Sequence, residues 1–219
     1  RPSCYDGGGI RYLRFPASAV GSMTLYLLGN DLRALQERAE LCCSHCEKHG
    51  IAWWQYYAAA FLGWLTVVRG EPDEGIERVQ NAFAAWQATG MLLGSDGLGI
   101  LLADACLEAV RKQRQGKDRV ADSPRAGLLT EGLARIEALL APDSPGGQTY
   151  RAELHRMRGE LLLARDGLVA AEEALDCFRR ALTLGRERGA LAWELRAAMS
   201  IVRLRQRQGQ GYTEELVKA

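Results

Sequence analysis

The residue types that could do chemistry in this chain gather in one short stretch, Cys42-Cys43-Ser44-His45-Cys46-Glu47-Lys48-His49. If this stretch is helical, Cys42, Cys46 and His49 are spaced four and three residues apart and share one face. Cysteine sulfur and histidine nitrogen are ligands that zinc prefers, so this face is a candidate metal or redox site. A second cysteine or histidine pair at matching spacing is missing, and free cysteine packs as a small hydrophobe. We therefore interpret the cluster as core packing and assign no cofactor, and we keep a metal site on Cys42, Cys46 and His49 as the alternative.

Two other features could belong to a catalytic site. His155 could act as a general base, but no serine or cysteine nucleophile with a carboxylate partner accompanies it as a motif. Gly7-Gly8-Gly9 has the composition of a phosphate cradle but lacks the lysine and the helix start that follow one. We expect His155 to pack or hydrogen-bond within the fold, and we expect the chain not to be an enzyme.

The elements that carry these residues are predicted to be helices joined in pairs. Runs with period two are missing, so we expect almost no strand. Apolar spacing, glycine breaks and capping residues place the pairs at about 16–49, 52–89, 98–140, 149–188 and 191–219, the last of them truncated. Asp31 is expected to cap one helix, Gly50 to end it, and Gly90 to end the helix that begins after Pro72. Residues 1–14 are predicted to be a flexible leader, and 15–219 a single helical-repeat domain.

Composition limits the classes of function. Lys and Arg number 28 against 27 Asp and Glu, a net charge of +1, which gives no electrostatic reason to expect direct binding to nucleic acid. No apolar run approaches the roughly 18 residues of a membrane span. Six cysteines in 219 residues, most of them in sequence suited to helix, fit a reducing cytoplasm better than a disulfide framework. The first residue, Arg1, and the lack of a targeting signal suggest a piece of a longer protein.

Self-similarity along the chain indicates a repeat architecture. The turns Gly29-Asn30-Asp31-Leu32 and Gly70-Glu71-Pro72-Asp73 are alike and stand about 40 residues apart, a period typical of solenoids. Ala174-Leu175 repeats the start of a second helix. The polar stretch 113–123 reads as an insertion between the helices of the third pair.

In two of the pairs, residues fall at the small or aliphatic positions of the tetratricopeptide pattern. They are Gly63, Gly75, Val79 and Ala82 in the second pair, and Gly159, Ala174, Phe178 and Ala181 in the fourth. Three further stretches carry a second likeness: Ala152–Leu162, Cys177–Leu182 and Trp193–Ala198. In these stretches the chain resembles the helical-repeat C-terminal region of large bacterial ATPase-containing regulators, which carry LuxR-type DNA-binding or nucleotide-cyclase domains elsewhere.

The resemblance implies an all-α, tetratricopeptide-like solenoid of about four and a half antiparallel helix pairs in a right-handed superhelix. It also implies that ATPase and output domains lie outside this chain, which has no phosphate-loop motif of its own. If Gly63 lies where two helices cross, the same phase places a set of side chains on the concave face. That set comprises Ser18, Ser22, Tyr57, Ala60, Trp64, Asp104, Arg156, Glu160 and Arg203.

From these observations we expect a non-enzymatic sensor or protein-interaction module of a bacterial, cytoplasmic regulator. Its predicted partners are a protein, peptide or small effector on the concave face, through Tyr57, Trp64, Asp104, Arg156, Glu160 and Arg203, together with the other domains of the same polypeptide. A homodimer is a further possibility. Two alternatives stay open: a small-molecule effector pocket closed by the 113–123 insertion, and a metal or redox sensor at the cysteine cluster.

Overall fold

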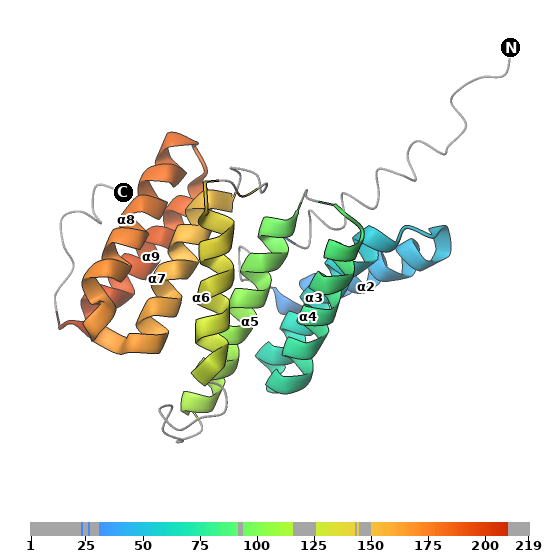
Figure 1. Ribbon diagram of the computed structural model, residues 1–219, viewed down its shortest axis with the longest axis horizontal. Coiled ribbons are helices and arrows are strands. Elements are labelled where there is room, and N and C mark those ends of the chain that lie inside the picture. Colours follow the sequence, from blue (N-terminus) through green and yellow to red (C-terminus); the bar gives the residue numbers. More distant parts are fainter. Residues whose placement is uncertain are drawn as a thin grey trace, which may run out of the picture. The chain divides into compact units, whose positions relative to one another are not determined.

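The computed structural model describes residues 23, 26, 31–91, 94–115, 126–142, 144 and 150–209 of the chain, and all regular structure in them is helical (Figure 1). The helices are α2 (Leu32–His49), α3 (Ala52–Arg69), α4 (Pro72–Ala88), α5 (Ser95–Gln115), α6 (Ala126–Leu140), α7 (Arg151–Asp166), the 3-10 turn η3 (Gly167–Ala170), α8 (Ala171–Glu187) and α9 (Leu191–Arg207). The all-α prediction is confirmed for this part of the chain. The predicted leader, Ser18, Ser22, residues 116–123 of the insertion and residues 210–219 of the truncated last pair lie outside it.

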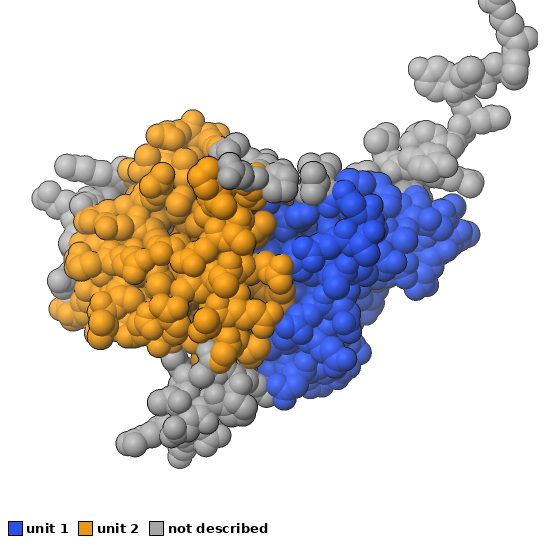
Figure 2. All heavy atoms as spheres, viewed as in Figure 1, with its two compact units in different colours: residues 1–101 blue, residues 102–219 orange. Residues whose placement is uncertain are grey.

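The chain divides into two compact units, residues 1–101 and 102–219, and the boundary falls within α5 (Figure 2). Unit 1 contains α2, α3, α4 and the first part of α5. Unit 2 contains the rest of α5, α6, α7, η3, α8 and α9.

Three turns between consecutive helices repeat one hydrogen-bonding scheme. At Gly50, Gly70 and Gly189 the glycine has positive φ, where residues with a side chain are strained. In each turn the glycine N–H donates to the carbonyl three residues earlier, and the next N–H donates to the carbonyl five residues earlier. This scheme satisfies carbonyl groups that the helix end would leave unpaired. The predicted Asp31 cap is also confirmed, since its Oδ1 accepts from the Ala34 N–H at 2.8 Å.

Unit 1 is built on the close crossing of α3 and α4. A Cβ added at Gly63 would lie 2.9 Å from the Val79 nitrogen, and one added at Gly75 would lie 2.6 Å from the Val67 nitrogen. Both distances are below van der Waals contact, so only glycine allows the two backbones to approach this closely. The prediction that Gly63 lies at a helix crossing is therefore confirmed.

Unit 2 has α7 at its centre, packed against α6, α8 and α9. Gly159 lies at the α7–α8 crossing, where an added Cβ would be 2.5 Å from Cε1 of Phe178. The turn η3 accounts for the extra residues between these two helices relative to the α3–α4 turn. A core of apolar side chains joins α7, α8 and α9: Leu163, Ala171, Ala174, Leu175, Phe178, Ile201 and Leu204.

None of the helices in the described ranges combines the length and the apolar composition that crossing a bilayer would require.

Candidate functional site: a buried charge cluster in unit 2

Charged side chains from three helices of unit 2 meet between these helices. Helix α7 contributes Glu153, Arg156 and Glu160, which share one helix face because they are spaced three and four residues apart. The other members come from α5 and α9. We call the set the charge cluster; it consists of Arg111, Glu153, Arg156, Glu160, Arg196 and Ser200.

One half of the cluster is centred on Glu153, which is 1% exposed. Arg156 donates to both of its carboxylate oxygens, through Nε at 2.9 Å and Nη2 at 2.6 Å. Arg196 of α9 donates to the same carboxylate, through Nη2 at 2.8 Å and Nε at 3.1 Å. Paired guanidinium bonds to a carboxylate are among the stronger hydrogen bonds in proteins, so Glu153 fixes α9 to α7.

The other half is centred on Glu160, which is 5% exposed. Its Oε1 accepts from the Ser200 hydroxyl at 2.7 Å and from Nη1 of Arg156 at 3.4 Å. Its Oε2 accepts from Nη2 of Arg111 at 2.7 Å, and Arg111 is also bound by Glu108 at 2.7 Å. One carboxylate therefore links α5, α7 and α9.

The arginines keep both carboxyl groups ionised. Burial alone would raise the pKa of Glu160, but the charges of Arg156 and Arg111 and the Ser200 hydrogen bond hold it below its usual value. The pKa of Glu153 is lowered in the same way, against its burial, by Arg156 and Arg196. Burial would lower the pKa of Arg156, and the two glutamates raise it instead. These groups are thus charged as well as buried, and removing one would leave its partners uncompensated.

The predicted binding residues of unit 2 lie in and around this cluster. Arg156 and Glu160 are members, and Asp104 and Arg203 are near enough for Asp104 to raise the pKa of Arg156 and for Arg203 to lower that of Glu160. Arg156 is 6% exposed and Asp104 8%, while Arg203 is exposed. Arg156 is already engaged by both glutamates, so the side chains open to a partner are those at the margin, Arg203 and the one-third-exposed Arg111.

The sequence analysis missed the other members of the cluster: Arg111, Glu153, Arg196 and Ser200. The alternation Glu153, Arg156, Glu160 on one face of an apolar helix is a signal that could have identified Glu153. Nothing local marks Arg196 and Ser200, whose partners are about 40 residues earlier in the chain.

Tyr57 and Trp64, the predicted binding residues of unit 1, lie inside an aromatic cluster. Tyr57 is 5% exposed, and its ring is within 6 Å of the rings of Trp54, Phe61 and Trp86. Trp64 is 8% exposed and meets Tyr26 edge-on at 5.1 Å. Both side chains contribute to the interior of unit 1.

Two cysteines of the cluster, Cys42 and Cys46, are packed inside unit 1. His49, by contrast, is exposed. Burial raises the pKa of Cys42 to about 12 and that of Cys43 to about 11, so both are neutral thiols at pH 7. In the described part of the chain no group of three His, Cys, Asp or Glu side chains could hold a metal ion. The cysteines described there are all free thiols.

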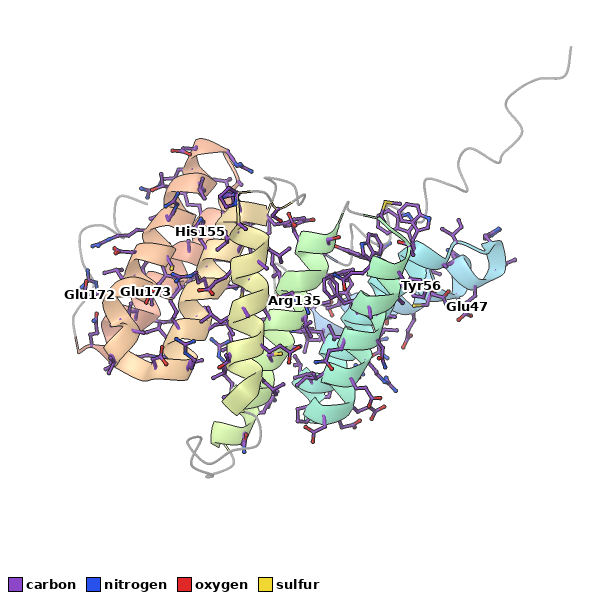
Figure 3. The ribbon with its side chains drawn as sticks, viewed as in Figure 1. Glu47, Tyr56, Arg135, His155, Glu172 and Glu173 are labelled. Atoms are coloured by element: carbon purple, nitrogen blue, oxygen red, sulfur yellow. The ribbon has the colours of Figure 1, made fainter. Side chains whose placement is uncertain are left out.

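His155 lies on α7 (Figure 3), near enough to three arginines of α7 and α8 for their charges to act on it. Burial and the charges of Arg180, Arg151 and Arg158 lower its pKa to about 4, and its Nε2 is buried with no hydrogen-bond partner. Arg158 bonds Glu173 at 2.6 Å and the Cys177 sulfur at 3.1 Å. A neutral imidazole with so low a pKa is a weak base, so these contacts favour packing over proton transfer for His155.

The comparisons with known proteins add no family to this description. Neither the protein-family models nor the curated proteins contain a match to this chain.

Proposed function

We propose that the chain is a non-enzymatic sensor or protein-interaction module of a bacterial signalling regulator, and that it binds its partner at the margin of the charge cluster. The partner class we propose is a peptide, protein or effector that presents a carboxylate. We further propose that the helices continue a tetratricopeptide-like right-handed superhelix, with ATPase and output domains elsewhere in the polypeptide. The recurring glycine turns and the glycine crossings at Gly63 and Gly159 support this architecture.

The observation that carries the proposal is the position of Glu160. This carboxylate accepts hydrogen bonds from α5, α7 and α9 at once, through Arg111, Arg156 and Ser200. A group that competes with Glu160 for one of these hydrogen-bond donors changes the packing of α5, α7 and α9 against one another. A ligand carboxylate is the natural competitor, because it offers arginine the same planar, bidentate acceptor.

Binding would act by population shift. A carboxylate that engages Arg203 and Arg111 at the exposed margin weakens the hold of Arg111 on Glu160, and so favours an arrangement in which α5 is less tightly fixed to α7. Coupling between two sites is typically worth about 1–3 kcal/mol, which is within what one charged hydrogen bond supplies. Since Arg111 lies on α5, a change in its bond to Glu160 alters how α5 is held to α7 within unit 2.

The test is capture of peptides that have a fixed C-terminal glutamate, displayed as an array, by the parent chain and three variants. Arg203→Gln and Arg111→Gln should each reduce capture by at least about fivefold, the effect of about 1 kcal/mol. The matched control is Arg179→Gln on α8, which removes an exposed arginine paired only with its neighbour Asp176. Equal capture by the parent, Arg203→Gln and Arg111→Gln, or equal loss in the control, would refute the proposal.

A small-molecule effector is the second candidate, and one observation in unit 1 favours it. The indole Nε1 of Trp86 is buried, and no described residue accepts its hydrogen bond. Half-buried Trp53 and Trp54 lie beside it, with ring centroids 6.2 and 6.4 Å away. A flat, apolar ligand with one acceptor oxygen would suit this group. Native mass spectrometry of the purified chain separates the candidates, since it detects a retained small molecule, a metal or a dimer.

A further inference from the structure

Helix α9 exposes a row of large apolar side chains. Leu191 is 76% exposed, Leu195 62% and Met199 42%, and their spacing of four residues puts them on one face. The opposite face of α9 is buried in the core with α7 and α8, through Ile201 and Leu204. We call Leu191, Leu195 and Met199 the α9 stripe. A continuous exposed apolar row on a helix already anchored by its other face is typical of a surface that binds a partner.

The border of the stripe is basic. Arg203 and Arg207 are exposed and lie one and two turns beyond Met199, and Arg196 is next to Leu195. Arg196 is held by Glu153, whereas Arg203 and Arg207 form no hydrogen bond or ion pair with any described residue. Glu194 is the acidic residue of α9, and it is already bound by Arg186 of α8 at 2.8 Å.

We propose that the α9 stripe is a docking surface for an amphipathic helix of another protein, one with leucine-like side chains on one face and aspartate or glutamate along its edge. Two features of the surface fit this occupant, namely the apolar row and its basic border. The bound helix would place its apolar side chains between Leu191, Leu195 and Met199, as in helix-in-groove recognition. Acidic residues at its edge then meet Arg203 and Arg207, where complementary charge fixes the orientation.

A second copy of the chain fits this surface less well. Parallel self-association through α9 would bring two basic borders together, and the one glutamate of α9 is already paired with Arg186. Like charges placed opposite each other across an interface oppose binding. The proposal rests on the interaction function proposed above, for which it names a surface and a partner class.

The experiment uses the full chain and a synthetic, labelled helix of 17 residues, the length of α9, with leucines spaced three and four apart and glutamates along one edge. Fluorescence anisotropy should show saturable binding. Leu195→Ser and Met199→Ser should each raise Kd at least about tenfold, and Arg203→Gln about threefold with a weaker salt dependence. The matched control is Leu168→Ser on η3, a leucine 52% exposed but off the stripe, which should bind as the parent does. Because these residues are exposed, circular dichroism should show every variant folded.

Four results would overturn the proposal. The first is equal affinity for a probe whose glutamates are replaced by lysines, and the second is failure of the probe to bind. The third is displacement of the probe by a peptide with the sequence of residues 210–219, which would make the chain itself the occupant. The fourth is a parent dimer that Leu195→Ser dissociates. If the probe fails to bind while Arg111→Gln still loses carboxylate-peptide capture, the α9 stripe is rejected and the proposed function stands.

Discussion

Replacing Gly159 by alanine tests how tightly α7 and α8 are packed. The added Cβ would lie 2.5 Å from Cε1 and 2.9 Å from Cδ1 of Phe178, and 3.0 Å from the Ala174 carbonyl oxygen. Carbon atoms in contact normally stand about 3.5–4.0 Å apart, so the overlap with the ring is about 1 Å. Phe178 and Ala174 are both 0% exposed, so neither can move aside into solvent.

The expected magnitude follows from two opposing effects. Alanine in place of glycine favours a helix interior by about 1 kcal/mol. Overpacking a tight core typically costs about 1–3 kcal/mol. We therefore expect Gly159→Ala to lower the free energy of unfolding of unit 2 by up to about 2 kcal/mol, despite the better helix propensity.

Gly127→Ala is the matched control. Gly127 lies in α6 of the same unit, its φ is not positive, and an added Cβ would meet nothing within 4 Å. Because Gly127 lies in the first turn of α6, this substitution should raise stability by less than the roughly 0.5–1 kcal/mol expected in a helix interior. Urea denaturation followed by circular dichroism compares the two directly, and the difference between them isolates the packing cost. If Gly159→Ala is as stable as Gly127→Ala, the α7–α8 crossing is looser than the structure shows and the reasoning fails.

Three other predictions concern the charged and titratable groups. Glu160→Gln should destabilise unit 2 by about 3 kcal/mol, because Arg156 stays buried with less compensation; an unchanged urea midpoint would show that solvent screens the cluster. The folded pKa values of Glu153 and Glu160 lie below their unfolded values, so the stability they contribute is present above about pH 4.3 and is lost as pH falls further. Glu160→Gln should therefore make the free energy of unfolding depend less steeply on pH in this range. Folding lowers the pKa of His155 from 6.5 to about 4, so as pH falls the unfolded chain binds the proton first and the folded state loses stability between these two values. His155→Gln should remove this loss when melting temperature is measured against pH. Cys42 and Cys106, each with a pKa raised to about 12 by burial, should resist iodoacetamide at pH 8 until denaturant is added, and rapid labelling of the native chain would contradict their burial.

Local signals in the sequence account well for the helices with glycine at their ends. The expected ranges 52–69 and 73–89 agree with α3 and α4 to within one residue, because Gly70 and Gly90 adopt the positive φ that ends a helix. The start of α5 was predicted at residue 98, but the helix begins at Ser95. Glycine disfavours a helix interior, yet at Gly97 an added Cβ would lie 2.5 Å from Tyr57 Oη, so tertiary packing decides this turn over propensity.

The charge cluster shows why the site was harder to predict than the fold. The helical phase drawn from Gly63 correctly grouped Arg156 and Glu160 on one side of α7, since spacing alone fixes that. Their burial depends on Arg196 and Ser200, which come from a helix that only the folded chain brings near. A sequence pattern shows which side chains share a face, but which charges neutralise each other is a tertiary fact.

The α9 stripe and the charge cluster lie on adjoining faces of one helix, which connects binding to helix packing. Leu195 and Arg196 are neighbours, as are Met199 and Ser200, so the stripe and the α9 members of the cluster alternate along the same two turns. A partner that rotates or shifts α9 must therefore strain the bonds from Arg196 to Glu153 and from Ser200 to Glu160. Because Glu160 also holds Arg111 of α5, a helix bound on the stripe should alter amide hydrogen exchange in α5 as well as in α9. Protection confined to α9 would mean that the surface binds without signalling, and that the cluster serves only to hold unit 2 together.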